Sequence, residues 1–256
     1  MSALEIYQFN CRSDNFGVLI HDPDIGITAS IDAPDENAIN EALDQKGWTL
    51  SHVLLTHHHF DHVEANIALK QKWGAIIVGN QADQDRIPGI DIGVACGQHF
   101  DFGTHKAKFI DTPGHTIGHV AIYFADQKLL FTGDTMFALG CGRVFEGTAE
   151  QMHKSLSVLA ALPDDTVVYC GHEYTLANAG FAMTIDPENG ALVERVAQIK
   201  ALRADKLPTL PTSIGQEKAT NPFLRVDDAG IRQRLNMENA SDVDVFAEIR
   251  RRKDEF

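Results

Sequence analysis

Four histidines and one aspartate lie within six consecutive residues, HHHFDH, at positions 57–62. Imidazoles repel one another once they are protonated, so a chain gains little by gathering them without a compensating partner. A divalent cation is such a partner, because imidazole and carboxylate groups together are ligands of zinc, iron and manganese rather than of calcium or magnesium. The stretch therefore predicts a metal centre.

Three more candidate ligands, His115, Asp134 and His172, each follow a short apolar run, and a glycine directly precedes each of them. The run at 51–56 leads into the histidine cluster in the same way. Loops that leave neighbouring strands at one edge of a sheet can converge on a single site. The repeated pattern predicts that all four loops supply ligands to one centre.

Side-chain alternation divides the cluster into two sets. In an extended segment His57 and His59 point in one direction and His58 points away, whereas Asp61 and His62 fall at the start of the next helix. Two sets of ligands indicate two ions that share one carboxylate. The predicted first set is His57, His59 and His115, the second is Asp61, His62 and His172, and Asp134 bridges the two ions.

The alternative for the cluster is a structural zinc site, which is normally four-coordinate and rich in cysteine. We expect His58 and His119 to support the ligands or the fold. The remaining histidines have the ordinary interpretation of surface or core residues: His21, His52, His99, His105 and His153.

Short β-type runs and helical patterns alternate through the first two thirds of the chain, which indicates an α/β layered domain with sheets that are not purely parallel. The expected strands are 17–22, 26–33, 51–56, 75–80, 105–112, 119–126, 128–134 and 166–172, and the expected helices are 36–47, 63–74 and 150–162. The segment 121–131 reads as two strands joined by a tight turn.

A mostly helical region is expected after Tyr174, which divides the chain into domains 1–174 and 175–256. We expect Asp186 to cap a helix that extends to residue 206, a proline-punctuated loop at 207–225, and a capped terminal helix at 241–256.

The formal net charge of −14 over 256 residues argues against a nucleic-acid or membrane-surface binder. The four cysteines form no CxxC pair, and the N-terminus carries no targeting pattern. These features predict a cytoplasmic protein with reduced thiols.

The quoted motifs match a known family. HHHFDH resembles the HxHxDH signature of the metallo-β-lactamase superfamily, and TPGHT, FTGDT and YCGHEYT resemble its other ligand motifs in the expected order. The stretches TPGHTIGH, GDTMFALGCGRVFEGT, TNPFLR and RRRKDEF are more specific and resemble the glyoxalase II family, the hydroxyacylglutathione hydrolases. This resemblance covers nearly the whole chain. It implies an αββα sandwich with a small C-terminal helical domain and the same division of the seven ligands.

The resemblance also implies an activity: hydrolysis of glutathione thioesters, above all S-D-lactoylglutathione to D-lactate and glutathione, in methylglyoxal detoxification. Two divalent ions are expected, zinc first and iron or manganese as alternatives, in a monomer. A water shared by two cations loses its proton near neutral pH and would attack the thioester carbonyl, with Asp61 and Asp134 as catalytic residues. The implied glutathione contacts are Arg143, Phe145, Tyr174, Arg250 and Lys253.

Alternatives remain open at this point. The same superfamily includes single-iron persulfide dioxygenases, β-lactamases and nucleases, and a metal-storage module lies outside enzymology. Cys141 could be a nucleophile, but we expect it to be structural. The basic residues of RRRKDEF could simply offset the dipole of the terminal helix.

Overall fold

The computed structural model describes residues 2–95 and 97–256, so that Cys96, one of the four cysteines, lies outside the described residues. The chain divides into two units. Unit 1 comprises the residues up to Asp111 together with Gly118–Gly133, and unit 2 comprises Thr112–Ile117 together with Asp134–Phe256. His57, Asp61 and their neighbours belong to unit 1, whereas the later predicted ligands belong to unit 2.

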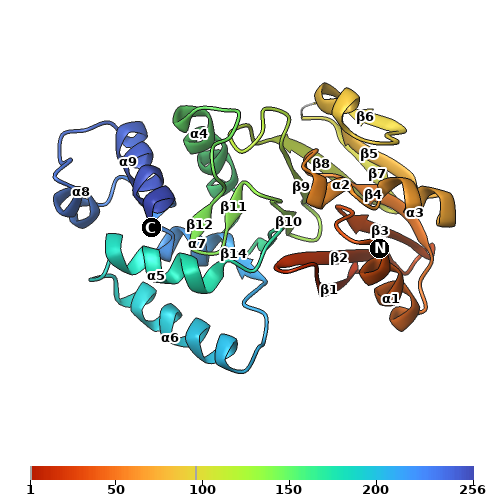
Figure 1. Cartoon of the computed structure of the whole chain (residues 1–256), viewed down its shortest axis with the longest axis horizontal. Coiled ribbons are helices and arrows are strands. Elements are labelled where there is room, and N and C mark those ends of the chain that lie inside the picture. Colours follow the sequence, from red (N-terminus) through yellow and green to blue (C-terminus); the bar gives the residue numbers. More distant parts are fainter. Residues whose placement is uncertain (1, 96) are drawn as a thin grey trace. The chain divides into compact units, whose positions relative to one another are not determined.

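A mixed six-stranded sheet, with strand order β1-β2-β3-β4-β5-β6, forms the centre of unit 1. Its strands are β1 (Glu5–Cys11), β2 (Asn15–Asp22), β3 (Ile27–Ile31), β4 (Leu50–Leu54), β5 (Ile76–Asn80) and β6 (Ile92–Val94). The first three pair antiparallel, and β3 to β6 pair parallel. Helix α1 (Glu36–Lys46) makes the crossover from β3 to β4, as a parallel connection requires. Figure 1 shows these elements in red to yellow.

Local capping explains where α1 begins and ends. The Asp35 carboxylate accepts a hydrogen bond from the Ala38 N–H at 2.9 Å, and Gly47 adopts the left-handed conformation with φ 67°. A glycine in this position ends a helix without the steric penalty of a side chain. The buried face of α1 presents Ile39 and Leu43 to the core that contains Leu19 and Ile77.

The helix predicted at 63–74 is wrong in its first turn. The structure has the short α2 (Phe60–Val63) followed by α3 (Asn66–Trp73). Between them the Ala65 N–H donates to the Ala33 carbonyl at 3.0 Å, and the Ala33 N–H donates to the His62 carbonyl at 2.8 Å. These two bonds to Ala33 interrupt the helix after Val63.

Four further strands of unit 1 pair antiparallel in the order β10-β9-β8-β7. They are β7 (His99–Phe102), β8 (His105–Asp111), β9 (Val120–Phe124) and β10 (Leu129–Phe131). The predicted hairpin at 121–131 is confirmed, because Leu129 pairs with Phe124 across a tight turn. The rings of Phe102, Phe124 and Phe131 are fully buried, and Phe124 contacts each of the other two edge to face.

Unit 2 carries short strands and helices. The strands are β11 (Met136–Phe137), β12 (Gly140–Cys141), β13 (Val167–Tyr169) and β14 (Thr212–Ser213). The helices are α4 (Ala149–Ala160), α5 (Thr175–Ile185), α6 (Gly190–Ala204), α7 (Ile214–Thr220), α8 (Ala229–Leu235) and α9 (Asp242–Glu255), with 3₁₀ turns η1 (Gln81–Arg86) in unit 1 and η2 (Pro222–Leu224) in unit 2. Figure 1 shows α5 and α6 packed side by side.

Two expectations for the C-terminal region are wrong. Helix α6 begins at Gly190 with Asn189 as its cap, whose side chain accepts from the Leu192 N–H at 3.2 Å. Asp186 instead accepts from Arg225 Nε at 3.1 Å, so its carboxylate holds a loop rather than a helix start. The segment 207–225 is not wholly a loop, since Ser213 caps α7 within it. The terminal helix begins after Ser241 as predicted.

A buried network in unit 2 fixes the turn between β11 and β12. The Glu217 carboxylate is fully buried, pairs with Arg195, and accepts from the Leu139 N–H at 2.9 Å. Asn221 donates to the Gly140 carbonyl at 3.0 Å from the same network. Leu139 has φ 58°, a conformation that a non-glycine residue adopts only when its surroundings hold it there.

The network yields a stability prediction. Glu217→Ala should lower the free energy of unfolding by about 3–5 kcal/mol, because it leaves the buried Arg195 charge without its partner and the Leu139 N–H unsatisfied. Urea denaturation followed by circular dichroism measures the change. Glu194→Ala, on the exposed face of α6, is the matched control and should shift stability by less than about 0.5 kcal/mol. Equal midpoints for the two variants would contradict the assignment.

Candidate metal centre

The histidines of the HxH segment lie beyond the end of β4 in unit 1. His57 Nε2 is 3.1 Å from His59 Nδ1, and His57 is 1% exposed. His58 lies elsewhere, with its Nδ1 3.1 Å from the Asp83 carboxylate. The alternation predicted for this segment is therefore what the structure shows. The Thr56 hydroxyl, 3.0 Å from His57 Nδ1, fixes the orientation of the first imidazole.

Asp61 and His62 lie on α2, the single turn that the Ala33 hydrogen bonds cut short. His62 Nε2 is 3.6 Å from Asp61 Oδ2. On the other side of the ring, His62 Nδ1 is 2.8 Å from Asp32 Oδ2. Asn15 Nδ2 donates to Asp61 Oδ2 at 3.1 Å. Each side chain of this pair is thus oriented by a further polar group, His62 by Asp32 and Asp61 by Asn15.

The three later residues lie together in unit 2. His115 Nε2 is 3.4 Å and His172 Nε2 is 3.5 Å from the same oxygen, Asp134 Oδ2. His115 Nδ1 is 2.8 Å from the Arg143 carbonyl, which sets the tautomer and the ring orientation. All three side chains are buried. Asp134 therefore presents one carboxylate oxygen to two imidazole nitrogens.

These separations suit metal coordination. Ligands bound at about 2.0–2.1 Å around a tetrahedral ion lie roughly 3.3–3.4 Å apart, which is the edge of the tetrahedron. The four pairs described within the units span 3.1 to 3.6 Å. Both units therefore contribute histidine and aspartate side chains that could hold divalent metal ions.

Glycine is required where the GCG segment approaches the Asp134 backbone. A Cβ at Gly142 would lie 2.0 Å from the Asp134 carbonyl oxygen and 3.2 Å from His115 Nδ1. Any side chain there would displace the bridging candidate or its neighbouring imidazole. Close packing against Asp134 and His115 thus explains why the GCG segment has a glycine at position 142.

The described cysteines do not take part in this chemistry. Burial raises the pKa of Cys141 to about 11 and that of Cys170 to about 12, so both remain neutral thiols at physiological pH. A neutral, buried thiol is a poor nucleophile. The structural interpretation of Cys141 agrees with this environment.

The basic residues predicted to contact glutathione form a cluster in unit 2. Arg250 is buried and donates from Nη1 to the Cys141 carbonyl at 2.8 Å and from Nη2 to Asp254 Oδ1 at 2.9 Å. Arg143 Nε is 3.7 Å from the same carboxylate oxygen. Lys253 is the third basic residue of the cluster. Desolvation and the charges of Arg250 and Arg143 lower its pKa to about 8.

The terminal helix separates its basic residues by face. Arg251 and Arg252 pair with Glu248 on the exposed side, the arrangement of ordinary helix surface pairs. Arg250 lies over the Phe223 ring at 5.3 Å, and Lys253 over the Phe181 ring at 5.2 Å. The ordinary interpretation of RRRKDEF therefore suits its second and third arginines, whereas Arg250 and Lys253 face the protein.

Two exposed aromatic rings accompany the histidines of unit 2. The Tyr174 ring stacks on His172 with centroids 4.7 Å apart, and the Phe145 ring lies 5.2 Å from His115. Both rings remain accessible, with Phe145 62% exposed. The two aromatic residues predicted as substrate contacts thus lie beside metal-ligand candidates.

Several residues that support the site were not predicted. Asp32, Asp83 and Asn15 each orient a residue of the HHHFDH segment. Asp32 carried a usable signal, because it follows a buried strand just as the ligands do, but its role depends on a contact with a residue 30 positions away. His119, expected to be a supporting residue, stacks on His57 at 4.8 Å.

The histidines given the ordinary interpretation have ordinary surroundings. His21 stacks on Trp48, His52 contacts the edges of Phe100 and Phe102, and buried His105 pairs with Asp126. Each of these contacts lies within unit 1 and stabilises the strands around it.

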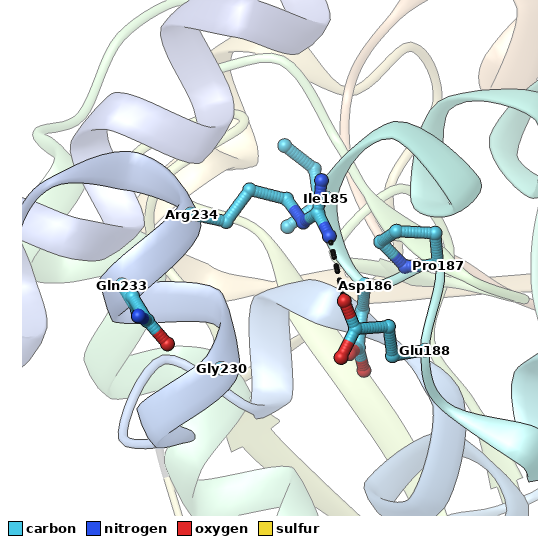
Figure 2. Close-up of a pocket in the computed structure, with 7 residues that line it drawn as sticks. All are labelled: Ile185, Asp186, Pro187, Glu188, Gly230, Gln233 and Arg234. Carbon is cyan, nitrogen blue, oxygen red and sulfur yellow. Dashed lines mark hydrogen bonds and ion pairs between the residues drawn. The ribbon is translucent and has the colours of Figure 1, made fainter.

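A separate pocket of about 400 Å³ lies in unit 2 between the end of α5 and α8 (Figure 2). Arg234 Nη2 and Glu188 Oε1, 3.3 Å apart, form an exposed ion pair in its lining. None of the predicted site residues lines this pocket. Its lining residues are Ile185, Asp186, Pro187, Glu188, Gly230, Gln233 and Arg234.

The model of the metallo-beta-lactamase superfamily matches residues 24–172, and the model of the hydroxyacylglutathione hydrolase C-terminus matches residues 173–256. A hydroxyacylglutathione hydrolase of Brucella anthropi is 61% identical over 99% of this chain and 97% of its own length. One from Rhizobium meliloti is 59% identical over the whole length of both chains. The chain therefore belongs to the hydroxyacylglutathione hydrolase family of the metallo-β-lactamase superfamily.

Solved structures agree with this fold. The crystal structure of ETHE1 from Myxococcus xanthus has a TM-score of 0.66 at 27% identity and covers 95% of each chain. The structure of TTHA1623 in a di-iron-bound form has a TM-score of 0.62 at 24% identity, covering 85% of this chain and all of that one. The expected fold, a metallo-β-lactamase fold with a C-terminal helical region, is confirmed. Within the described residues, none of the helices has the length and apolar character needed to cross a membrane.

Asp32 yields a prediction for the metal ligands. Asp32→Asn should weaken retention of divalent metal roughly 10–100-fold, because the imidazole of His62 loses the carboxylate that orients it. Equilibrium dialysis against a competing chelator measures this change. Asp101→Asn, an exposed position in β7, is the matched control and should retain metal normally. Equal metal retention by the two variants would show that Asp32 serves only the fold.

Proposed function

We propose that this protein hydrolyses glutathione thioesters, with S-D-lactoylglutathione as the substrate and D-lactate and glutathione as products, in methylglyoxal detoxification. The observation that carries the proposal is the cluster of Arg143, Arg250 and Lys253 in the same unit as three metal-ligand candidates. A chain with net charge −14 needs such a cluster if it is to bind an anionic peptide. The names of its relatives support the same reaction.

The proposed cofactor is a pair of divalent ions, with zinc first and iron or manganese as alternatives. The proposed ligands are His57, His59 and His115 for one ion, Asp61, His62 and His172 for the other, and Asp134 for both. The approach of His115 and His172 to one oxygen of Asp134 supports its assignment as the bridge. The absence of cysteine from this set argues against a structural zinc site.

When bound, the ions supply an acidified water and positive charge for the oxyanion of the thioester carbonyl. The residues of the chain do the rest. Asp61, held by the Asn15 amide, would orient the attacking water or take its proton. The Arg143 carbonyl keeps His115 in one tautomer. The leaving glutathione thiol has a pKa low enough, about 8.5 for a cysteine thiol, to depart without a strong general acid.

We assign the glutathione portion of the substrate to Arg143, Phe145, Tyr174, Arg250 and Lys253. The exposure of Phe145 and Tyr174 leaves both rings available for contact with a peptide. Phe145 has no hydroxyl, so it would contribute apolar contact alone. Arg143, Arg250 and Lys253 would supply the charge, and buried Arg250 is held in place by its hydrogen bond to the Cys141 carbonyl.

Finer features of the proposal follow from the same observations. Residues 1–174 would form the catalytic domain and residues 175–256 the substrate-binding domain, close to the junction between the two family models. The buried thiols of Cys11, Cys141 and Cys170, which form no disulfide, support a reducing, cytoplasmic location. We propose a monomer.

The test is hydrolysis of S-D-lactoylglutathione by the purified protein, with its metals measured in the same preparation. We expect rapid hydrolysis and two divalent ions per chain. S-lactoyl-N-acetylcysteamine, a small thioester without the glutathione carboxylates, is the matched substrate and should have a much higher KM. Equal KM values would contradict the glutathione assignment. Oxygen consumption with glutathione persulfide, without thioester hydrolysis, would favour the dioxygenase alternative instead.

A further inference from the structure

Asp254 is an acidic residue inside the basic cluster. Its Oδ1 atom accepts from Arg250 Nη2 at 2.9 Å and lies 3.7 Å from Arg143 Nε. One carboxylate oxygen therefore contacts both guanidinium groups. A carboxylate of a bound ligand would require the same N–H donors.

The other acids near the end of α9 have different partners. Glu248 and Glu255 both pair with Arg251 on the exposed side of the helix. Asp254 thus differs from its neighbours in facing the cluster. Its side chain is 44% exposed and that of Arg143 is 65% exposed, so solvent and ligands reach the pair.

We propose that Asp254 is an internal counter-ion that competes with a carboxylate of the ligand for Arg143 and Arg250 and thereby sets the affinity for glutathione compounds. The inference rests on the proposed function and extends it. In the absence of ligand, Asp254 lowers the repulsion among the three cations. When the ligand binds, its carboxylate displaces Asp254 from the shared guanidinium donors.

The opposite role, in which Asp254 positions the cations for the ligand, has less support. Arg250 is buried and is held independently by the Cys141 carbonyl and the Phe223 ring. It therefore keeps its place when Asp254 is neutralised. The contact with Arg143 is long and exposed, and such pairs contribute little to holding a side chain. Removal of the negative charge should thus dominate, and it should strengthen binding of an anion.

Lys253 provides an independent readout. Its ammonium is faced by Arg250, Arg143 and Asp254 and by Cys141, whose thiol stays neutral, and it lies over the Phe181 and Phe256 rings. Asp254 acts to raise the pKa of Lys253, which lies at about 8. Neutralising Asp254 lowers that pKa further. The variant therefore loses its Lys253 charge at a lower pH than the unmodified protein does.

The experiment is calorimetric titration of the metal-loaded full chain with S-methylglutathione, whose sulfur does not ionise, at pH 6.5 and pH 8.5. Asp254→Asn should bind about three- to tenfold more tightly than the unmodified protein at pH 6.5, the effect of one nearby exposed charge. That gain should shrink at pH 8.5. Glu255→Gln makes the same charge change on the adjacent residue and should alter binding less than twofold.

Weaker binding by Asp254→Asn, or an equal gain in Glu255→Gln, would overturn the proposal. Asp254→Glu, which keeps the charge, should bind as the unmodified protein does. Binding by Asp254→Glu as tight as that by Asp254→Asn would also overturn the proposal. If the unmodified protein neither binds S-methylglutathione nor hydrolyses glutathione thioesters, the proposed function fails together with this inference. Normal hydrolysis with unchanged affinity in Asp254→Asn overturns the inference alone.

Discussion

The rest of the site depends on one interaction, the approach of the Asp134 carboxylate to two imidazole rings. The Asp134 Oδ2 atom lies within 3.5 Å of the ring nitrogens of both His115 and His172. A buried carboxylate beside two imidazoles is stable only if positive charge compensates it, either from protonated histidines or from a metal ion. The backbone packs closely against this residue, since only glycine fits at position 142, beside the Asp134 carbonyl. The Glu217 network holds the β11–β12 turn that carries the GCG segment, and the Cys141 carbonyl of that segment accepts from Arg250 of the basic cluster.

The basic cluster solves a second electrostatic problem. An acidic chain repels anions over long distances, so binding an anionic peptide requires a local concentration of positive charge. Arg250 supplies part of this charge at every pH, because a guanidinium keeps its proton even when it is buried in a protein. Lys253 supplies a part that depends on pH, because burial and neighbouring cations lower its pKa to about 8. Binding is therefore expected to be strongest below that pH, where the ammonium is charged.

Much of the fold was predictable because its signals are local. The apolar runs gave β4, β5 and the β9–β10 hairpin, and Ser241 gave the start of the terminal helix. The errors arose where a distant group decided the outcome. Ala33 interrupts the helix after Val63, and Asp186 binds Arg225 instead of capping the helix that it was expected to cap. For the site, residue types and alternation separated His57 from His58, whereas Asp32 and Asp254 also contact His62 and Arg143, residues that lie far from them in the sequence.

The central claim is that one carboxylate, Asp134, serves two metal ions. Metal-free protein can be titrated with zinc while bound metal and thioester hydrolysis are followed together, in the unmodified chain and in Asp134→Ala. We expect two zinc ions per unmodified chain, with activity complete only when the second ion is bound. We expect Asp134→Ala to bind fewer than two ions at the same free zinc concentration and to lose nearly all activity. An Asp134→Ala protein that retains two tightly bound ions and a near-normal rate would contradict the account.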